Sequence, residues 1–584
     1  MGALGAFFPY RRPPELDGRG KPHRTLIIVG AGPVGLAMAL DWAQHGHEVL
    51  VLGAGESLSE GSRAICFAKR TLEICDRLGF GDRVVDKGVS WNVGKVYRQD
   101  DLLYEFNLLA EGGHQRPAFV NLQQYYFEHY QLQALAERSV QSDVDVRWNN
   151  RVVAVTQRGD GATLTVECAD GTYDLGCDWL IACDGAASPI RKMLGLTSDG
   201  QVFRDRFLIA DVKIQGGGAA FSNERWFWFD PPFHRNQSAL LHRQADDVWR
   251  LDFQLGWNAD PDVERRPERV LPRIRAMLGE EVTFALEWVS VYTFQCRRME
   301  RFVHERVIFA GDSAHQVSPF GARGANSGIQ DVDNLAWKLD LVVRGLAPQR
   351  LLDSYDNERT QAADENILNS TRSTDFITPK TDISRTFRDA TLELAAKYPF
   401  ARKLVNSGRL SVPAHYPESV LNTPDRDAWP EGCATSLAPG SPAVDAAIVA
   451  DGAPGWLLSH LGGSFTIVVF AASGMSSALR ERLDSLLPRS VPVRVVAIAR
   501  FAGEMLPDTT CLIDAEGMCF VRYAAAGDAV YVFRPDQHVA GRRAGLSIEW
   551  IPAAVRTACM DDGTVSNGDG NGFAQYATER VTAR

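Results

Sequence analysis

The stretch "TLIIVGAGPVGLAMALDWAQHGHEVLVL", Thr25 to Leu52, decides how this chain folds. It reads as a buried strand, a glycine-rich turn, a helix and a second strand, one βαβ unit in about 30 residues. The turn contains G-x-G-x-x-G, formed by Gly30, Gly32 and Gly35. The first glycine allows the tight turn, the second lets a pyrophosphate approach the backbone, and the third lets helix and strand pack closely. The pattern predicts a Rossmann-type fold that binds a dinucleotide at the helix N-terminus.

The residue after the second strand departs from this pattern. Such folds carry an acid there for the adenosine ribose, whereas this chain has Gly53, and the nearest carboxylate is Glu56. The loss of one charge-assisted hydrogen bond costs about 1.5–3 kcal/mol, which a cofactor held along its whole length tolerates. We therefore expect a weaker adenosine anchor. We also expect Gly53→Glu to tighten binding, provided that the new carboxylate reaches the ribose.

Length and composition limit the function classes. The chain has 584 residues, enough for more than one domain, with 45% hydrophobic and 23% charged residues, which are globular values. A net charge of -11 argues against nucleic-acid binding. No apolar run approaches a membrane span, and the N-terminal charges follow a very short apolar run, the wrong order for a secretory signal. Ten cysteines without C-x-x-C suit reduced thiols and no common zinc site, so we expect a cytoplasmic enzyme without a metal.

A second motif lies at Arg306 to Leu339, "RVIFAGDSAHQVSPFGARGANSGIQDVDNLAWKL". A buried strand ends at Gly311-Asp312, where the carboxylate can accept a sugar-alcohol hydroxyl. Gly324 permits close backbone approach, and a helix starting near Ala325 points its N–H groups at what lies in front. Such a helix end stabilises the negative charge that develops on a flavin during reduction.

A third stretch, "CDWLIACDGAASPIRKMLG", carries Asp184, Gly185, Ser188 and Arg191. With the glycine pattern and the Gly311-Asp312 motif, it makes residues 25–372 resemble the single-component FAD-dependent aromatic hydroxylases, which have the para-hydroxybenzoate hydroxylase fold. The C-terminal α/β pattern resembles the thioredoxin-like domain appended to phenol hydroxylase and to 3-(3-hydroxyphenyl)propionate hydroxylase.

The resemblance implies non-covalent FAD and a set of residues that hold it. Arg63 matches the arginine beside the flavin and the nicotinamide path, Gln123 the glutamine at the ribityl–phosphate region, and Pro319 the proline whose carbonyl faces the reactive edge. Arg63 could instead be an ordinary surface charge. For His315 the two interpretations are a catalytic histidine and a packed, hydrogen-bonded one. The implied cofactor residues are Gly30, Gly32, Pro33, Gly35, Arg63, Gln123, Asp184, Gly185, Arg191, Gly311, Asp312, Pro319, Gly324, Ala325 and Asn326.

A substrate base is harder to place. Some phenol-hydroxylating relatives carry an aspartate two residues after the arginine that matches Arg63, but here that residue is Ile65. A base must then come from an inserted sheet domain. The candidates are Tyr292, His234, His242 and Asp252, and we expect Arg63, Pro319, Tyr292 and His234 to be catalytic.

The predicted fold is α/β, with a Rossmann-type FAD-binding domain, an inserted substrate sheet and a thioredoxin-like domain. The parts are an N-terminal extension (1–24), the FAD-binding domain (25–204 and 299–410), the substrate sheet domain (205–298), a linker (411–437), the thioredoxin-like domain (438–560) and a flexible tail (561–584). We expect the thioredoxin-like domain to dock through an apolar surface. Cys511 and Cys519 do not form C-x-x-C, so we expect a structural or oligomeric role.

The resemblance implies a monooxygenase that uses NADPH or NADH and O2 to hydroxylate a small phenolic substrate through a flavin C4a-hydroperoxide. Alternatives are epoxidation, Baeyer–Villiger oxygenation or oxidase chemistry on the same fold, and a non-catalytic flavin-binding interaction protein. A homodimer is possible, and no nucleic-acid or membrane partner is expected.

Overall fold

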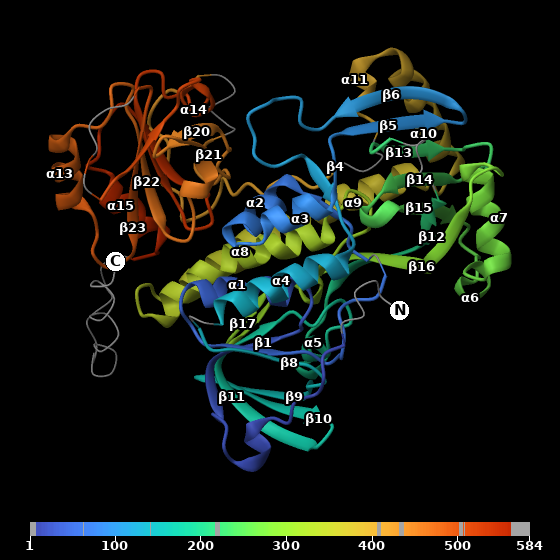
Figure 1. Ribbon diagram of the computed structural model, residues 1–584, viewed down its shortest axis with the longest axis horizontal. Coiled ribbons are helices and arrows are strands. Elements are labelled where there is room, and N and C mark those ends of the chain that lie inside the picture. The colour runs from blue at the N-terminus through green and yellow to red at the C-terminus, as the bar shows by residue number, and fades with distance from the viewer. Residues whose placement is uncertain are drawn as a thin grey trace.

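The computed structural model describes residues 7–61, 63–139, 142–215, 222–405, 410–430, 437–501, 506 and 508–561. Figure 1 shows a first sheet below a layer of helices, a second sheet above them to the right, and the C-terminal part beside the helices to the left. Apart from Asp561, the predicted flexible tail lies outside the described residues.

The first sheet contains the βαβ unit that the glycine pattern predicts. Its strands β18, β11, β1, β2 and β8 pair in parallel in this order. Strand β10 adds antiparallel to β11 and to β9, and β17 adds antiparallel to β18. The strands are β1 (His23–Val29), β2 (Val49–Leu52), β8 (Val144–Arg147), β9 (Arg151–Arg158), β10 (Gly161–Cys168), β11 (Gly171–Ala182), β17 (Val303–His304) and β18 (Val307–Phe309).

Helices cover this sheet because its parallel strands are apolar on both faces. The first of them, α1, is buried from Gly35 to Ala43 and packs against α4 and α8. The helices of this half are α1 (Pro33–Gln44), α2 (Lys69–Arg77), α3 (Gly81–Lys87), α4 (Gln124–Arg138), α5 (Pro189–Met193), α8 (Gly324–Val343) and α9 (Leu351–Ile377).

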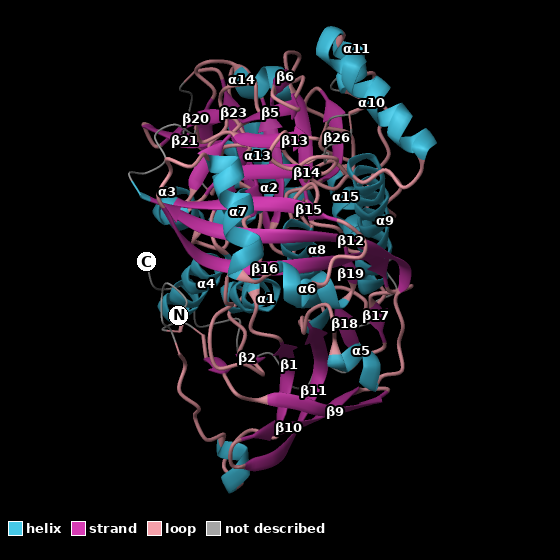
Figure 2. Ribbon diagram, turned by 90° about the vertical axis from the view of Figure 1, so that its right-hand side faces the viewer, coloured by secondary structure: helices cyan, strands magenta, loops and turns pink. Residues whose placement is uncertain are grey.

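The second sheet is the predicted substrate sheet, with the order β19-β16-β12-β15-β14-β13-β5-β6. Figure 2 shows α7 crossing its outer face. The sheet reaches beyond residues 205–298, because β5 pairs in parallel with β13 although the two are far apart in sequence. The elements are β5 (Val93–Arg98), β6 (Asp101–Asn107), β12 (Asp199–Ile214), β13 (Arg225–Phe229), β14 (Ser238–Arg243), β15 (Val248–Leu255), α6 (Pro261–Glu264), α7 (Pro267–Leu278), β16 (Phe284–Arg298) and β19 (His315–Gln316).

Smaller elements join the two sheets. A three-stranded sheet, β3-β7-β4, lies between the start of α8 and the substrate sheet, and two further helices follow α9. Their bounds are β3 (Cys66–Ala68), β4 (Val89–Trp91), β7 (Phe119–Asn121), α10 (Asp382–Lys397) and α11 (Pro399–Arg402).

The C-terminal part is a thioredoxin-like α/β sheet, in the order β21-β20-β24-β23-β22-β25-β26. Cys519 is buried, and burial raises the pKa of its thiol, which opposes thiolate formation. The elements are β20 (Ala447–Ala450), β21 (Ala453–Trp456), β22 (Phe465–Phe470), α13 (Ser477–Leu486), β23 (Val493–Ala499), β24 (Thr510–Ile513), α14 (Met518–Arg522), β25 (Ala529–Phe533), β26 (Val539–Ala544) and α15 (Ile551–Ala558). Among all described helices, none has both the length and the apolar character needed to cross a bilayer.

The C-terminal domain meets the half built on the first sheet through an apolar patch and a charged network. Trp337 of α8 packs edge-on against Phe465 of β22. Beside it, Arg534 donates to both carboxylate oxygens of Glu358 on α9 at 2.6 and 3.0 Å, and Lys338 of α8 donates to the same carboxylate at 2.8 Å. The expected apolar docking surface is therefore only part of the contact.

Candidate active site

Three loops meet at one edge of the first sheet. Strands β1, β11 and β18 are parallel neighbours, with Val29 paired to Ala182 and Ala182 paired to Phe309. Because the carboxyl ends of parallel strands share an edge, the glycine loop, the Asp184-Gly185 loop and the Gly311-Asp312 loop come together there. Ligands of open parallel sheets bind at this edge.

The glycine loop has the geometry that each of its positions predicts. A Cβ atom on Gly30, where φ is +115°, would lie 2.2 Å from the Cys183 carbonyl oxygen. One on Gly35 would lie 1.9 Å from the Gly30 carbonyl oxygen, so helix and turn are in contact. At Gly32 a Cβ atom would meet no atom within 4 Å. Pro33 follows as the first residue of α1. The only glycine of the three with free space is the one that a phosphate is predicted to approach.

The Gly311-Asp312 loop is fixed by Asp331 of α8. Asp331 accepts from the Gly311 backbone at 2.8 Å, contacts His315 Nε2 at 2.7 Å and accepts from Arg359 at 2.6 Å. Burial favours a raised pKa for Asp331, but His315 and Arg359 lower it. His315 is thus a packed, hydrogen-bonded residue, as one of the two interpretations of the sequence held.

Asp312 itself remains exposed, and its carboxylate has no hydrogen-bond partner among the described residues. The surrounding protein raises its pKa, an effect that His315 opposes. Its Oδ1 lies 3.9 Å from the position of a Cβ atom on Gly324, at the start of α8. Gly324 and Ala325 are partly exposed there. A free carboxylate beside a helix N-terminus is suited to accept hydroxyl groups of a bound ligand.

In the Asp184-Gly185 loop, the Asp184 carboxylate is partly hydrogen-bonded and Gly185 has free space around it. Asp184 Oδ2 accepts from the Ile190 backbone at 2.9 Å, whereas its Oδ1 is buried without a partner. A Cβ atom on Gly185 would meet nothing within 4 Å. Arg191 donates to the carbonyl oxygens of Ser313 and Ala186. Its guanidinium therefore connects this loop to the Gly311-Asp312 loop.

Two residues that were predicted to hold the cofactor, Asn326 and Gln123, form hydrogen bonds within the protein. Asn326 accepts from the Ala68 backbone and donates to the Cys66 carbonyl oxygen, both at 2.8 Å, which attaches β3 to α8. Gln123 donates to the Ala245 carbonyl oxygen at 3.0 Å. Only the Oε1 atom of Gln123, buried without a partner, is left for a ligand.

Arg63, Pro319 and Tyr292 are exposed, and electrostatic coupling links Tyr292 to both Arg63 and Asp312. The surrounding protein, with Asp312 adding to the effect, raises the pKa of Tyr292 to about 12, while Arg63 opposes the shift. The phenol is therefore protonated at neutral pH and can donate a hydrogen bond. Tyr292 belongs to β16 of the substrate sheet, whereas Arg63 and Asp312 belong to the half built on the first sheet.

The structure places His234 elsewhere, which argues against the catalytic role predicted for it. Its ring packs edge-on against Phe253, and its Nε2 donates to the Gln254 carbonyl oxygen at 2.6 Å. Phe253 belongs to the apolar cluster under α7, on the outer face of the substrate sheet. Because strand residues alternate between faces, His234 is separated from Tyr292 by the sheet itself.

His242 and Asp252, the other two candidates, lie on the inner face near Arg250. Burial, with Arg225 and Arg250 nearby, holds the pKa of His242 well below its usual range. Burial raises the pKa of Asp252 to about 6, although Arg250 and Arg225 counteract it. Sequence reasoning missed Arg225. Its alternation with Trp226 along a strand was the available signal.

We expect Asp252→Asn to stabilise the protein above pH 6. The folded-state pKa of Asp252 lies above its unfolded value of 3.8, so the wild type loses stability as pH rises from about 4 to 6, whereas the asparagine variant does not. The difference in the free energy of unfolding should reach about 1–3 kcal/mol at pH 7–8 and vanish near pH 4. Urea titrations of both proteins at pH 4, 6 and 8 measure it. A constant difference across this range would contradict the assignment.

The structure corrects the expectation for Gly53. A Cβ atom there would lie 3.0 Å from the Ala31 Cβ and 3.5 Å from the Arg147 carbonyl oxygen, which already accepts from the Gly53 backbone. The missing acid has a steric cause, because the glycine loop and β8 enclose this position. Gly53→Glu should therefore not tighten cofactor binding.

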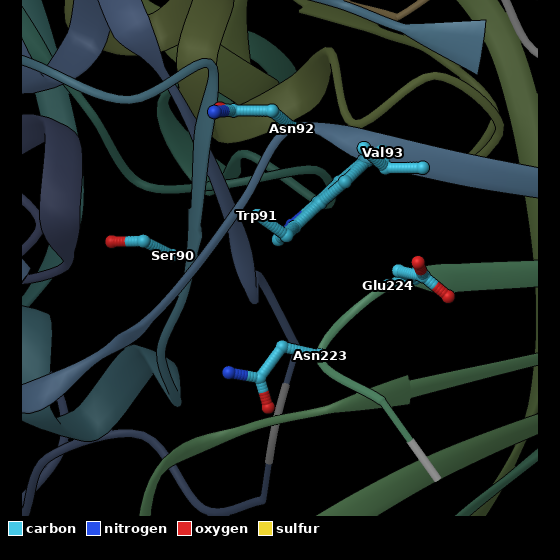
Figure 3. Close-up of a pocket in the computed structure, with 6 residues that line it drawn as sticks. All are labelled: Ser90, Trp91, Asn92, Val93, Asn223 and Glu224. Atoms are coloured by element: carbon cyan, nitrogen blue, oxygen red, sulfur yellow. The ribbon is translucent and has the colours of Figure 1, made fainter.

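A separate hollow of about 230 Å³ lies outside these loops. Figure 3 shows its lining, with Trp91 between the polar ends of Ser90 and Glu224. Trp91 donates through its ring nitrogen to Asn121 at 2.8 Å. None of the residues predicted to bind the cofactor or to catalyse lines this hollow.

Taken together, the loops fit an extended dinucleotide. Open space at Gly32 and Gly185 accommodates phosphates, the unpaired Asp312 carboxylate suits hydroxyl groups, and the α8 N-terminus suits negative charge.

Comparison with known proteins agrees with this fit. A family model described as "FAD binding domain" matches residues 23–370. A flavin-dependent monooxygenase of Mycobacteroides abscessus is 31% identical over 357 residues, which are 58% of this chain and 72% of the relative. A 3-(3-hydroxy-phenyl)propionate/3-hydroxycinnamic acid hydroxylase of Klebsiella pneumoniae subsp. pneumoniae is 27% identical over 97% of this chain and 99% of the relative.

Solved structures extend the likeness of fold to the C-terminal domain. The flavin-dependent monooxygenase PieE, in complex with FAD and substrate, has a TM-score of 0.77 at 22% identity, over 92% of this chain and 99% of PieE. Aklavinone-11 hydroxylase, with FAD and aklavinone, has a TM-score of 0.71 at 22% identity, over 93% and 100%. The family match, the relatives and the loop geometry agree, and the chain belongs to the FAD-dependent monooxygenases.

Proposed function

We propose that this monooxygenase hydroxylates a phenolic aromatic substrate, with NADPH or NADH and O2 as co-substrates. The observation that carries the proposal is the contact of the substrate sheet with the elements that begin the cofactor site. His242 Nδ1 lies 3.7 Å from the Cys66 sulfur, and Asn326 at the start of α8 donates to the Cys66 carbonyl oxygen. An aromatic-acid hydroxylase that matches almost the whole chain supports it.

The proposed roles follow from the contacts. FAD, when bound, supplies the hydride acceptor and the oxygen-activating ring. Gly32 and Gly185 leave room for its phosphates, and the Asp312 carboxylate accepts its hydroxyl groups. The α8 N-terminus favours negative charge in front of it. Arg63 is exposed, and we assign it the contact with the nicotinamide co-substrate.

Asp252 is the best candidate for the group that takes the substrate's phenol proton. Tyr292, with a pKa of about 12, holds its own proton, and the depressed pKa of His242 disfavours the charged imidazolium that a base must become. The pKa of Asp252, about 6, leaves it ionised at neutral pH and close to the range in which a base works well. Ile65, in place of the acid of some relatives, is buried and cannot serve.

The proposal is tested on the purified protein. Heat-released cofactor should be FAD, and NADPH or NADH oxidation should rise at least severalfold with a phenol that leaves as a catechol, identified by mass spectrometry. Release of peroxide without oxygenated product would favour oxidase chemistry. A lactone or an epoxide would show the alternative oxygenations. If the protein retains FAD but no phenol of a broad panel stimulates NADPH or NADH oxidation, it would be a flavin-binding protein without hydroxylase activity.

We also propose a cytoplasmic location, where nicotinamide nucleotides are available. All nine described cysteines are unpaired, which suits a reducing compartment. A homodimer stays a prediction, which sedimentation analysis tests.

A further inference from the structure

The start of the predicted linker runs along the loop that leads into α8. The Ser411 backbone donates to the Gly321 carbonyl oxygen at 2.8 Å, and the Ala414 backbone donates to the side chain of Gln330 on α8 at 3.1 Å. We call residues 411–416 the connecting segment. It is hydrogen-bonded to the elements that form the cofactor site, so it is more than a covalent link between two domains.

Tyr416, the last residue of the connecting segment, is 1% exposed. Its hydroxyl oxygen accepts a hydrogen bond from Arg359 of α9 at 2.6 Å. Among the described residues, the other side-chain acceptors of Arg359 are Asp331 and Ser327, both on α8. Burial raises the pKa of Tyr416 to about 12, although Arg359 counteracts this shift. The hydroxyl is therefore neutral at neutral pH, and it orients the guanidinium while the counter-charge stays with Asp331.

Arg359 connects Tyr416 to the loops that bind the cofactor. It donates to Asp331 at 2.6 Å, and Asp331 accepts from the Gly311 backbone, next to the free carboxylate of Asp312. Gly311 also lies against the start of α1, because a Cβ atom there would lie 2.9 Å from the Val34 side chain. The orientation of the Arg359 guanidinium therefore bears on both the Gly311-Asp312 loop and the glycine loop.

The C-terminal domain holds Tyr416 from the opposite side. The Tyr416 backbone donates to the Gly440 carbonyl oxygen at 2.9 Å, and the centroids of the Tyr416 and His538 rings are 5.0 Å apart. The Arg534 guanidinium lies 5.8 Å from the centroid of the same Tyr416 ring. Tyr416 thus lies between a domain that contains no predicted cofactor residue and the Arg359–Asp331 pair that fixes the Gly311-Asp312 loop.

We propose that Tyr416 is a positioning residue for FAD, through which the C-terminal domain holds the Gly311-Asp312 loop in its binding geometry. This inference goes beyond the proposed function, because it concerns cofactor retention and is independent of the substrate. A loop that is already ordered binds more tightly, since less conformational entropy is lost on binding. Coupling between two sites is reciprocal, so bound FAD must also stabilise the contact between Tyr416 and the C-terminal domain.

Tyr416→Phe in the full chain tests the proposal. The substitution removes only the hydroxyl group and keeps the ring between His538 and Arg534. Titration of the apo-protein with FAD, followed by the quenching of flavin fluorescence, gives the dissociation constant. The Kd of Tyr416→Phe should be about 3- to 10-fold higher than that of the wild type, the range that one buried hydrogen bond contributes.

The matched control is Tyr523→Phe. Tyr523 is also fully buried, but its hydroxyl donates to the Val444 carbonyl oxygen at 2.7 Å, within the C-terminal domain. Both substitutions should lower the melting temperature of the apo-protein by a similar amount, whereas Tyr523→Phe should change the Kd of FAD less than about twofold. If Tyr416→Phe gives no soluble protein, His538→Gln serves as the second variant. It removes the ring that packs on Tyr416 and should raise the Kd about 2- to 5-fold.

Hydrogen exchange, measured by mass spectrometry, gives a readout that a purely structural role would not change. FAD should slow exchange at residues 411–416 and 534–540 in the wild type and in Tyr523→Phe, but much less in Tyr416→Phe. Three results would overturn the proposal. They are an unchanged Kd in the variant that folds, an equal rise in that variant and in Tyr523→Phe, and exchange at residues 534–540 of the wild type that does not respond to FAD.

Discussion

Glu358→Ala is expected to lower the free energy of unfolding by about 3–5 kcal/mol, as breaking a buried ion pair does. The Glu358 carboxylate, 2% exposed, binds Arg534 of the C-terminal domain and Lys338 of α8. Burial alone would raise the pKa of Glu358, but these two cations hold it far below its usual range. Burial also lowers the pKa of Lys338 to about 8, against the influence of Glu358. Alanine would leave Lys338 buried without its counter-ion and Arg534 paired with Asp536 alone.

Urea unfolding followed by circular dichroism measures this effect, with Glu393→Ala as control. Glu393 forms an ion pair with Arg98 at 3.2 Å, but its side chain is 69% exposed. Exposed pairs contribute about 0–1 kcal/mol, so the control should shift little. Equal small shifts in both variants would show that solvent reaches the junction between the domains.

The second large effect concerns Gly32 and Gly35, for which we expect different consequences of the same substitution. Gly35→Ala should abolish soluble expression or cost several kcal/mol, because its methyl group would lie 1.9 Å from the Gly30 carbonyl oxygen. Gly32→Ala should fold normally, since φ is -90° and nothing lies within 4 Å. It should nevertheless weaken FAD binding by about 2–4 kcal/mol, because the methyl group stands where the phosphates approach the helix N-terminus.

Apo-protein melting curves and FAD titrations distinguish the two glycines. The Gly32→Ala apo-protein should melt within about 2 °C of the wild type, about the shift that 1 kcal/mol produces in a large domain, while its FAD dissociation constant rises. An unchanged dissociation constant would mean that the phosphates bind elsewhere along the sheet edge.

The sequence was most informative where local geometry determines the residue. Gly30, Gly32 and Gly35 each meet the surroundings that their spacing predicts, since a tight turn before a helix leaves few alternatives. Gly311-Asp312 likewise follows directly from the end of a buried strand. Each of these signals lies within a short stretch of sequence, and together they predicted the FAD-binding half.

Residues of the substrate sheet were harder to assign, because their roles depend on strand register. His234 and His242 look equivalent in sequence, yet one lies under α7 and the other faces Cys66. In the sequence, Arg225 is one charged residue beside a tryptophan. Only the pairing of its strand with β14 shows on which face of the sheet it lies. The Glu358–Arg534 contact was likewise out of reach, since it joins two domains whose docking leaves no local pattern.

The pairing of β5 with β13 means that the substrate sheet is not a detachable module. Residues 93–107 are made before most of the first sheet, yet their hairpin finds its neighbouring strand only after residue 225 has been synthesised. Such a long-range contact forms late and slowly during folding. For the same reason, a chimera that exchanges residues 199–298 with a relative would keep a foreign edge hairpin. Transplanting substrate preference between such enzymes should therefore require moving both segments together.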